Sequence, residues 1–278
     1  MNKNVIILGK ECNNNNNSIP DFIYRDLNNK KSIQYQIVQE NSNDWKIYFY
    51  ESGTLTFLHN KPEYLDVFLV GGGSSSDAGG GDEQMPGSGG AGGFTSRGII
   101  KLGLNDNDYQ IIIGDGGIST GSTGQDGKPS SAFGLIAKGG IAPKKDNNYI
   151  GQGGSGGGGY NKKDGETYIN WTGADGGSDG KNGSGTDRAG QGQGFTTREF
   201  YEPNGTLYAG GGGGASSATN DAAGGKGGEG GGGHGSDRKN IGMTSGLPNT
   251  GGGGGACNYS KTTAGGSGIV VIRNLRNS

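Results

Sequence analysis

The chain has 278 residues and a formal net charge of −2, and its Lys and Arg residues are scattered among Asp and Glu. Hydrophobic residues make up only 28% of it, against about 45–50% in an average globular protein. The scattered charges exclude the basic patch expected of a nucleic-acid-binding protein, and the low hydrophobic content excludes an apolar core that runs through the whole chain.

The beginning of the chain carries one short apolar run and one asparagine run. Val5–Leu8 is too short for the core of a signal peptide or for a membrane span, so we expect synthesis in the cytoplasm with no signal peptide. Asn13–Asn17 predicts a flexible loop or a low-complexity linker. Cys12 and Cys257 are far apart and match no metal-ligand spacing, which favours two reduced thiols over a disulfide.

Residues 1–70 are predicted to form a β-rich head. Apolar side chains alternate with polar or amphipathic ones in Trp45–Tyr50, the period-two pattern of a half-buried strand. A turn leads to a second strand at Thr54–Leu58, so we expect these two strands to form a hairpin. A third, apolar strand at Leu65–Val70 runs directly into the first glycine tract, Gly71–Gly73.

Residues 71–278 form the second predicted region, in which glycine tracts recur. The chain contains 66 glycines, and all but Gly9 and Gly53 lie between Gly71 and Gly268. No stretch of this region has the apolar periodicity of a helix, and each glycine disfavours helix by about 1 kcal/mol relative to alanine. We therefore predict almost no α-helix. Apolar inserts with the length of strands separate some of the tracts: Ile99–Leu104, Tyr109–Ile113, Ala132–Ala137 and Ile269–Ile272.

Glycine tracts this dense are either disordered or ordered by something other than side-chain burial, because glycine loses more backbone entropy on ordering than any other residue. A disordered glycine-serine linker is one alternative. The apolar end Ser267–Arg273 favours order, since a strand must pair with another strand. The ordered alternative is a bundle of polyglycine-II helices, which are similar to polyproline II and bond to one another. The predicted fold is therefore mostly β and irregular, with packed polyglycine-II helices and connecting loops after the head.

Four features suggest ligand binding or chemistry, and each is better explained by ordinary polar residues. Gly121–Lys128 has one residue too many for a phosphate-binding loop, and Pro129 stands where Ser or Thr is needed. Gly176–Asp187 is similar to a calcium-binding repeat but is not tandem. His59 and His234 have no Cys or carboxylate cluster beside them at ligand spacing. We therefore predict no catalytic residues, no metal, no cofactor and no enzymatic activity.

Six segments, taken together, form a sequence pattern that can be compared with known families. The most distinctive of them is Thr196–Gly214 (TTREFYEPNGTLYAGGGGG). The others are Leu65–Gly73 (LDVFLVGGG), Gly90–Thr95 (GAGGFT), Tyr109–Gly117 (YQIIIGDGG), Asn249–Gly255 (NTGGGGG) and Gly265–Arg273 (GGSGIVVIR), and the strand pair Trp45–Leu58 precedes them. Together these segments resemble the glycine-rich tail proteins of phages and prophages of low-GC Gram-positive bacteria. The resemblance covers residues 45–278. This family is similar in character to the distal adhesins of long tail fibres in phages of enteric bacteria.

The resemblance implies a bundle of polyglycine helices with receptor-binding loops at its tip, in a virion protein of the phage tail. Residues 1–70 would be the region that attaches it to other tail, fibre or baseplate proteins. Its other partner would be a polysaccharide or protein on the host surface. Neither nucleic acid nor membrane insertion is expected. A purely structural tail component without receptor contact stays open as an alternative, as does, more distantly, a glycine-rich wall or matrix protein of cellular origin.

Receptor contacts are expected in segments that depart from the family motifs: residues 142–150, 160–172, 215–223, 236–247 and 256–263. Exposed aromatic side chains stack on sugar faces, and lysine and arginine bind phosphates. The aromatics would serve equally well as anchors at the bases of the loops. The candidates for receptor contact are Tyr149, Tyr160, Tyr168, Trp171, Lys144, Lys145 and Arg238.

Overall fold

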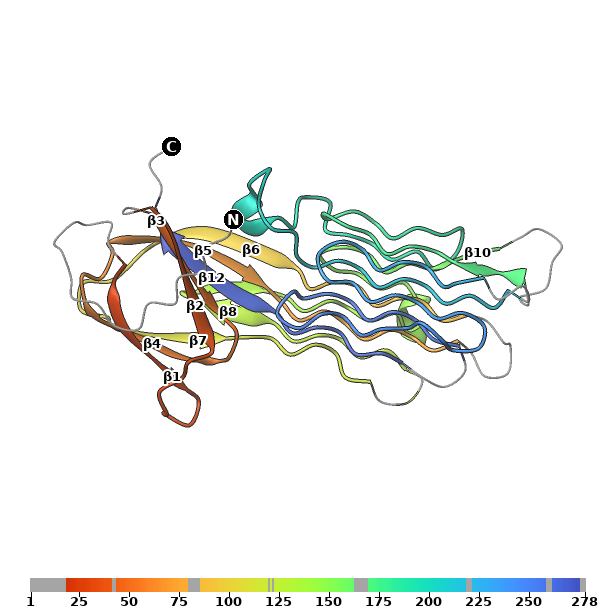
Figure 1. The fold of residues 1–278 in the computed structure, drawn as a ribbon, viewed down its shortest axis with the longest axis horizontal. Coiled ribbons are helices and arrows are strands. Elements are labelled where there is room, and N and C mark those ends of the chain that lie inside the picture. The colour runs from red at the N-terminus through yellow and green to blue at the C-terminus, as the bar shows by residue number, and fades with distance from the viewer. Residues whose placement is uncertain are drawn as a thin grey trace.

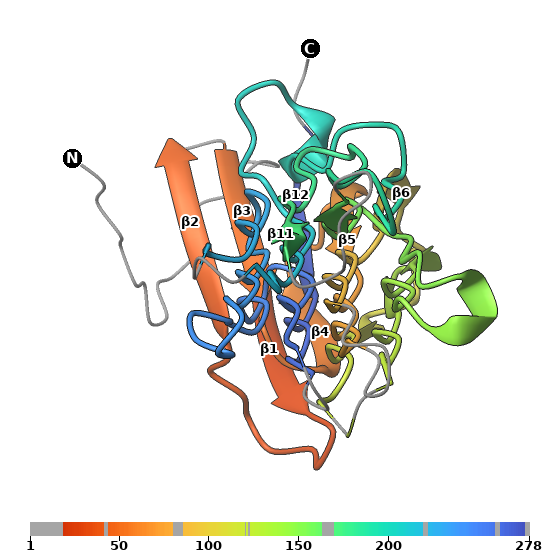
Figure 2. The same ribbon diagram turned by 90° about the vertical axis from the view of Figure 1, so that its right-hand side faces the viewer.

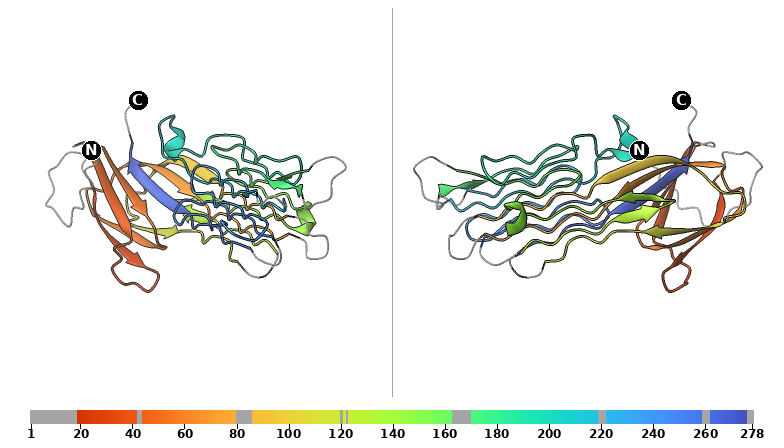
Figure 3. Two further views of the ribbon diagram at one scale, coloured as in Figure 1. Left: turned by 45° about the vertical axis from the view of Figure 1, so that its right-hand side comes forward. Right: turned by 180° about the vertical axis from the view of Figure 1, so that it is seen from behind.

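The protein is elongated, with a β-sandwich at one end and long glycine-rich segments that run side by side away from it (Figures 1 and 3). This description rests on a computed structural model. Strands and short 3-10 turns occur in the described part of the chain, and α-helices do not, which confirms the prediction of a mostly β and irregular fold. The structure describes residues 19–41, 44–79, 86–119, 121, 123–162, 170–218, 222–258 and 262–275.

One sheet of the sandwich is antiparallel and has five strands in the order β1-β4-β7-β8-β9. The turn between β8 and β9 contains Phe133 at φ +51° and Gly134 at φ +80°, so the predicted strand Ala132–Ala137 is a tight hairpin. The strands of this sheet are β1 (Asp21–Asp26), β4 (Gly53–His59), β7 (Asp108–Ile112), β8 (Ser130–Ala132) and β9 (Leu135–Ala137).

The other sheet is also antiparallel, with the order β2-β3-β12-β5-β6. The last described strand therefore lies at its centre, between two strands from the first quarter of the chain. The two sheets are completed by strands from both sides of residue 70. The strands of this sheet are β2 (Tyr35–Asn41), β3 (Asp44–Phe49), β5 (Tyr64–Val70), β6 (Thr95–Lys101) and β12 (Ile269–Asn274).

The predicted hairpin between β3 and β4 is wrong, although both strands exist. β3 pairs with β2 and β12, whereas β4 pairs with β1 and β7 in the opposite sheet. The short turn between them crosses the sandwich, because the apolar side chains of the two strands then face each other across the core. The core consists mainly of side chains from alternate positions: Trp45, Ile47, Phe49, Leu55, Phe57, Leu65, Val67, Leu69, Ile111, Val270 and Ile272.

A second apolar cluster covers the outer face of the sheet that contains β12. Phe68 and Val271 point away from the main core and pack against Phe200 and Tyr208. This cover comes from residues 199–208, which include the 3-10 turn η3 (Glu199–Tyr201). Both faces of β5 and β12 are therefore buried, which explains why their sequences are apolar runs and do not alternate.

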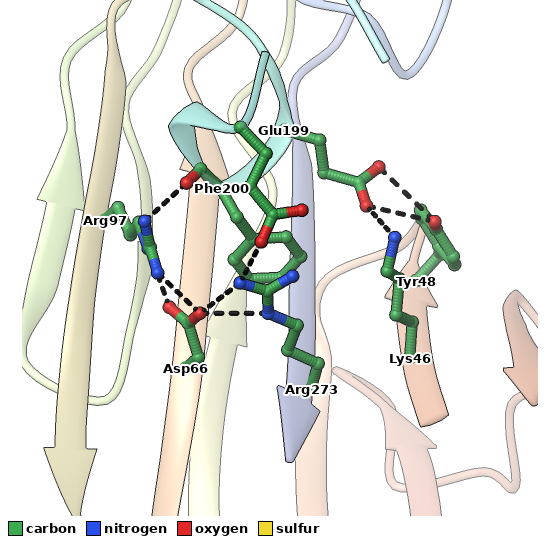
Figure 4. A network of polar contacts seen from close by, with 8 residues as sticks. Lys46, Tyr48, Asp66, Arg97, Glu199, Phe200 and Arg273 are labelled. Atoms are coloured by element: carbon green, nitrogen blue, oxygen red, sulfur yellow. Dashed lines mark hydrogen bonds and ion pairs between the residues drawn. The ribbon is translucent and has the colours of Figure 1, made fainter. Parts of the chain in front are cut away.

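Buried charges fix η3 to this face of the sheet (Figure 4). Asp66 accepts hydrogen bonds from the guanidinium groups of Arg97 and Arg273, with N···O distances of 2.7–2.9 Å. The Arg273 guanidinium lies 3.9 Å from the ring centroid of Phe200, and Arg97 donates to the Phe200 carbonyl. Glu199 pairs with the Lys46 ammonium at 2.8 Å. These contacts hold Phe200 at φ +52°, a conformation that non-glycine residues rarely adopt.

The glycine-rich segments are joined by backbone hydrogen bonds that repeat every three residues. In the segment 210–217, every third N–H group donates to the same neighbouring segment, at N···O distances of 2.8–3.1 Å. The three neighbours are residues 230–236, 171–177 and 87–90. The pairs are Gly210–Gly230, Gly213–Gly233 and Ser216–Ser236, then Gly211–Gly177, Gly214–Ala174 and Ser217–Trp171, and finally Gly212–Gly90 and Ala215–Gly87.

The carbonyl groups of the same segment accept hydrogen bonds from three further segments. Gly253 and Ala256 donate from one, Gly225 and Gly228 from the next, and Gly158 from the third. The segment 210–217 is therefore surrounded by neighbours that use its backbone polar groups in turn. Figure 2 shows these segments nearly end on, gathered side by side. Backbone bonding thus replaces an apolar core in this half of the molecule.

Candidate functional site

The glycine-rich segments reverse direction at the end farthest from the sandwich, where strand β10 lies (Figures 1 and 3). β10 (Tyr160–Asn161) pairs antiparallel with β11 (Thr172–Gly173), and the two form a small separate sheet. Tyr160 is the first residue of β10, and Trp171 directly precedes β11. This sheet is therefore the natural starting point for the site.

Tyr160 and Trp171 form a stacked pair. Their ring centroids are 5.1 Å apart and their planes differ by 14°. Tyr160 is fully buried, whereas Trp171 is half-buried. The expectation of an exposed ring at Tyr160 is therefore not met, because Trp171 and the adjoining backbone cover it. Tyr160 instead supports the partly exposed indole of Trp171.

Arg188 connects this pair to Tyr149. Its guanidinium carbon lies 3.9 Å from the ring centroid of Tyr149 and 5.6 Å from that of Tyr160. Tyr149 and Arg188 are both half-buried and both have positive φ, +60° and +53°. Three aromatic candidates from residues 149–171 thus come together, and Arg188 joins them.

Lys162 and Asp187 complete the group. They form an ion pair, with 41% of the lysine side chain and 33% of the aspartate side chain exposed. The Lys162 ammonium lies 5.0 Å from the ring of Trp171 and 5.9 Å from that of Tyr160. We call Tyr149, Tyr160, Lys162, Trp171, Asp187 and Arg188 the aromatic–charge cluster. Lys162 lies in the segment 160–172 where receptor contacts were expected, but neither it nor Asp187 or Arg188 was among the candidate residues.

The remaining candidates have other surroundings. Lys144 pairs with Asp126, with 3.0 Å between Nζ and Oδ2, and Lys145 is exposed in the 3-10 turn η1 (Lys145–Asn147). Arg238 is half-buried in a turn. Lys144 adjoins the aromatic–charge cluster only through its backbone, since the Tyr149 N–H donates to the Lys144 carbonyl at 2.8 Å. Tyr168 lies outside the described residues.

Comparison with known families connects this architecture to a wider group. A family model described as a glycine-rich domain matches residues 51–275. The chain belongs to this glycine-rich domain family. The matched part begins just before β4 and includes all later described strands, so that β1, β2 and β3 precede it. A comparison with curated proteins found no match.

Within the glycine-rich domain, not every segment expected to be a loop is one. Residues 215–218, the described part of the expected loop 215–223, continue the hydrogen-bonded segment 210–217. Ser216 and Ser217 are buried there, and their N–H groups donate to Ser236 and Trp171 in the same three-residue pattern. The other expected loops include turns at the segment ends, and parts of 160–172 and 256–263 lie outside the described residues.

The residues considered for chemistry in the sequence have structural surroundings. His234 is exposed, and its Nδ1 accepts a hydrogen bond from Gly227 N at 3.1 Å. His59 is exposed at the end of β4. Cys257 is buried, and Cys12 and Asn13–Asn17 lie outside the described residues. Among the described residues, no three His, Cys, Asp or Glu side chains gather as they would around a metal ion.

Asp77 is a buried carboxyl near the same end of the domain. It is 3% exposed, and its Oδ2 has no hydrogen-bond partner among the described residues. Burial raises the pKa of Asp77 to about 7, and the positive charge of Arg188 opposes this rise. The carboxyl is therefore coupled electrostatically to the aromatic–charge cluster. In the described parts of the chain, no helix is long and apolar enough for a membrane span.

Proposed function

We propose that this protein is a tail adhesin of a phage or prophage of low-GC Gram-positive bacteria. It binds the bacterial surface through side chains presented at the far end of a rigid glycine-rich scaffold. One observation carries the proposal: three aromatic candidates and their charged partners gather near the end of the scaffold that is remote from the sandwich. The resemblance in Leu65–Gly73 and Thr196–Gly214 supports the assignment to a phage tail.

The scaffold consists of polyglycine-II helices in this proposal. Such a helix has about three residues per turn and no hydrogen bonds within itself, so its backbone groups point outward to neighbouring helices. The three-residue repeat of partners along residues 210–217 supports this assignment. A Cβ at Gly212 would lie 2.0 Å from the carbonyl oxygen of Gly254, and so the helices pack too closely for a larger residue there.

Rigidity serves binding in such a design. Side chains that are fixed before contact lose less conformational entropy on binding, and less of the interaction free energy is spent on ordering them. The contacts formed by η3 and its charged partners join the scaffold to the sandwich. The sandwich end, which contains both β1 and the end of β12, faces the rest of the tail in this arrangement.

The partners that follow from the proposal are a tail, fibre or baseplate protein at the sandwich end and a polysaccharide or protein receptor at the far end. The protein is a virion component made in the host cytoplasm, and it acts by binding and not by catalysis. The alternative is a structural tail component without receptor contact. The buried charges around η3 are compatible with that alternative, since their contacts hold parts of this chain together.

Binding of the purified protein to bacteria tests the proposal. We expect the fluorescently labelled full chain to bind intact cells of at least one strain in a panel of low-GC Gram-positive bacteria, and to block adsorption of the phage that carries it. Mass spectrometry of purified virions should detect the protein in the tail. Presence in virions without binding to any strain would favour the structural alternative, and absence from virions would overturn the assignment to a phage tail.

A further inference from the structure

We propose that the aromatic–charge cluster is the host-contact site of the adhesin and that it binds a pyranose unit of a cell-surface polysaccharide. This inference rests on the proposed adhesin function and specifies its ligand. A pyranose ring has an apolar face of C–H groups and a rim of hydroxyl groups that both donate and accept hydrogen bonds. A binding site for it needs an aromatic surface beside polar groups of both kinds.

The aromatic surface is the outer part of Trp171. Trp171 as a residue is half-buried, with its Nε1 on the buried side, and its indole stacks on the fully buried ring of Tyr160. Tyr149, also half-buried, adds a second aromatic group beside Arg188. In this pair the buried ring of Tyr160 supports Trp171, and Trp171 is the member that reaches the surface. Such a pair is suited to stacking on a ligand.

The polar groups around this surface are of both kinds. Lys162 and Arg188 carry N–H groups that can donate hydrogen bonds, and the Asp187 carboxylate, which pairs with Lys162, carries acceptor oxygens. The hydroxyl of Thr186, next to Asp187, helps to hold these groups: it accepts from the Lys162 N–H at 2.9 Å and donates to the Tyr160 carbonyl at 3.4 Å. Lys162 and Asp187 neutralise each other, so the cluster has no strong excess of positive charge. This balance favours a hydroxyl-rich ligand over a strongly anionic one.

The backbone holds these groups in place before any ligand arrives. Tyr160 and Asp187 exchange two hydrogen bonds, each with an N···O distance of 3.1 Å, which brings β10 and Asp187 together. β10 pairs with β11 directly after Trp171. Ser217 donates from the glycine-rich scaffold to the Trp171 carbonyl at 3.0 Å. The cluster is thus mounted on the scaffold, as a site that binds without reorganisation requires.

The cluster can be tested with labelled full-length protein and intact cells of the strain that binds it best. Periodate, which cleaves the vicinal diols of sugars, should abolish binding, and protease treatment of the cells should leave it unchanged. Trp171→Ala should weaken binding by about tenfold or more, as expected for an aromatic anchor. Asp187→Asn, which removes the charge with little change in shape, should weaken it by about threefold or more.

Phe195→Ala provides the matched control, because Phe195 is an exposed aromatic near the sandwich and outside the cluster. It should bind within about twofold of the parent. The two tryptophans allow a direct check, since Trp45 is buried in the sandwich and Trp171 is the indole near the surface. Purified wall polysaccharide from the same strain should therefore change the fluorescence of the parent and leave that of Trp171→Ala unchanged.

Each outcome bears on a different statement. If the parent binds cells and Trp171→Ala binds as Phe195→Ala does, the cluster is not the contact site and the adhesin function stands. If protease and not periodate abolishes binding, the saccharide assignment is overturned. If Trp171→Ala does not fold, Asp187→Asn and Lys162→Gln decide, and unchanged binding by both overturns the inference. If the parent binds no strain, the adhesin function fails and this inference fails with it.

Discussion

Gly212 lies in the middle of the segment 210–217, where one added methyl group tests the packing of the glycine-rich scaffold. A Cβ at this position would lie 2.0 Å from the carbonyl oxygen of Gly254 and 2.5 Å from its carbonyl carbon. Ordinary van der Waals contact of a Cβ begins at 3.4 Å. The obstacle is backbone and cannot rotate away, so Gly212→Ala must move two segments apart by more than an ångström.

The cost follows from the hydrogen bonds that join those two segments. Gly253 donates to Gly210 at 2.9 Å and Ala256 donates to Gly213 at 2.8 Å. Separation leaves buried backbone groups without partners, and each such group costs about 1–3 kcal/mol. Alanine also restricts the unfolded chain more than glycine does, and this stabilises the folded protein by only about 0.4–1 kcal/mol. We expect Gly212→Ala to lower the free energy of unfolding by about 3–6 kcal/mol, which corresponds to a fall in Tm of roughly 10 °C or more.

Thermal unfolding of Gly212→Ala and Gly103→Ala, compared with the parent, measures this effect. Gly103 is exposed, and a Cβ there would meet only the exposed Asp106 side chain, which can rotate away. The control makes the same chemical change and should lie within about 0.5 kcal/mol of the parent. Equal midpoints for the two variants would refute the packed scaffold, because a disordered tract tolerates alanine without loss.

Three further predictions concern the charged groups and the backbone. Asp66→Ala should lower the free energy of unfolding by about 3–5 kcal/mol, because it leaves the guanidiniums of Arg97 and Arg273 without their shared carboxylate. Denaturant unfolding measures this, and a midpoint equal to the parent's would contradict it. Because folding raises the pKa of Asp77 to about 7, its contribution to stability is greatest below about pH 4 and falls as the pH rises to 7. As the pH rises from about 5 to 8, the stability of Asp77→Asn relative to the parent should therefore increase by about 2–3 kcal/mol. A stability difference that does not change with pH would argue against a buried neutral carboxyl. Far-ultraviolet circular dichroism should combine strand and polyproline-II character without the paired minima of α-helix, and those minima would contradict the fold.

The sequence predicts the strands better than their partners. The apolar runs at Leu65–Val70 and Ile269–Ile272 correspond to β5 and β12, because a buried strand needs side chains that tolerate burial. Their pairing could not be predicted, since several apolar strands offer equivalent partners. The failed β3–β4 hairpin shows the same limit. A short turn is compatible with pairing in one sheet and with crossing to the other, and packing across the core decides between them.

The candidate site was predictable in part. Aromatic residues in segments that depart from the family motifs identified Tyr149, Tyr160 and Trp171, which the structure brings into one cluster. Sequence could not assign the buried, supporting role to Tyr160, because burial depends on which ring lies above it. Asp187 and Arg188 follow a glycine-rich stretch and resemble loop residues. Only the alignment of neighbouring segments places them beside β10.

The run Ser74–Ser76 shows why composition cannot separate an ordered scaffold from a flexible linker. Each serine forms two hydrogen bonds with one residue of another segment. The serine N–H donates to the carbonyl of that residue, and the serine hydroxyl oxygen accepts from its N–H. The partners are Ala91, Gln125 and Thr263, with distances of 2.7–3.1 Å. Three consecutive residues therefore face three directions, as the three-residue repeat requires, and each buried hydroxyl accepts a hydrogen bond. In a sequence, the same Gly-Ser composition is typical of a solvated linker. What distinguishes the two is the presence of six neighbouring segments in register, a property of the whole chain that no single tract reveals.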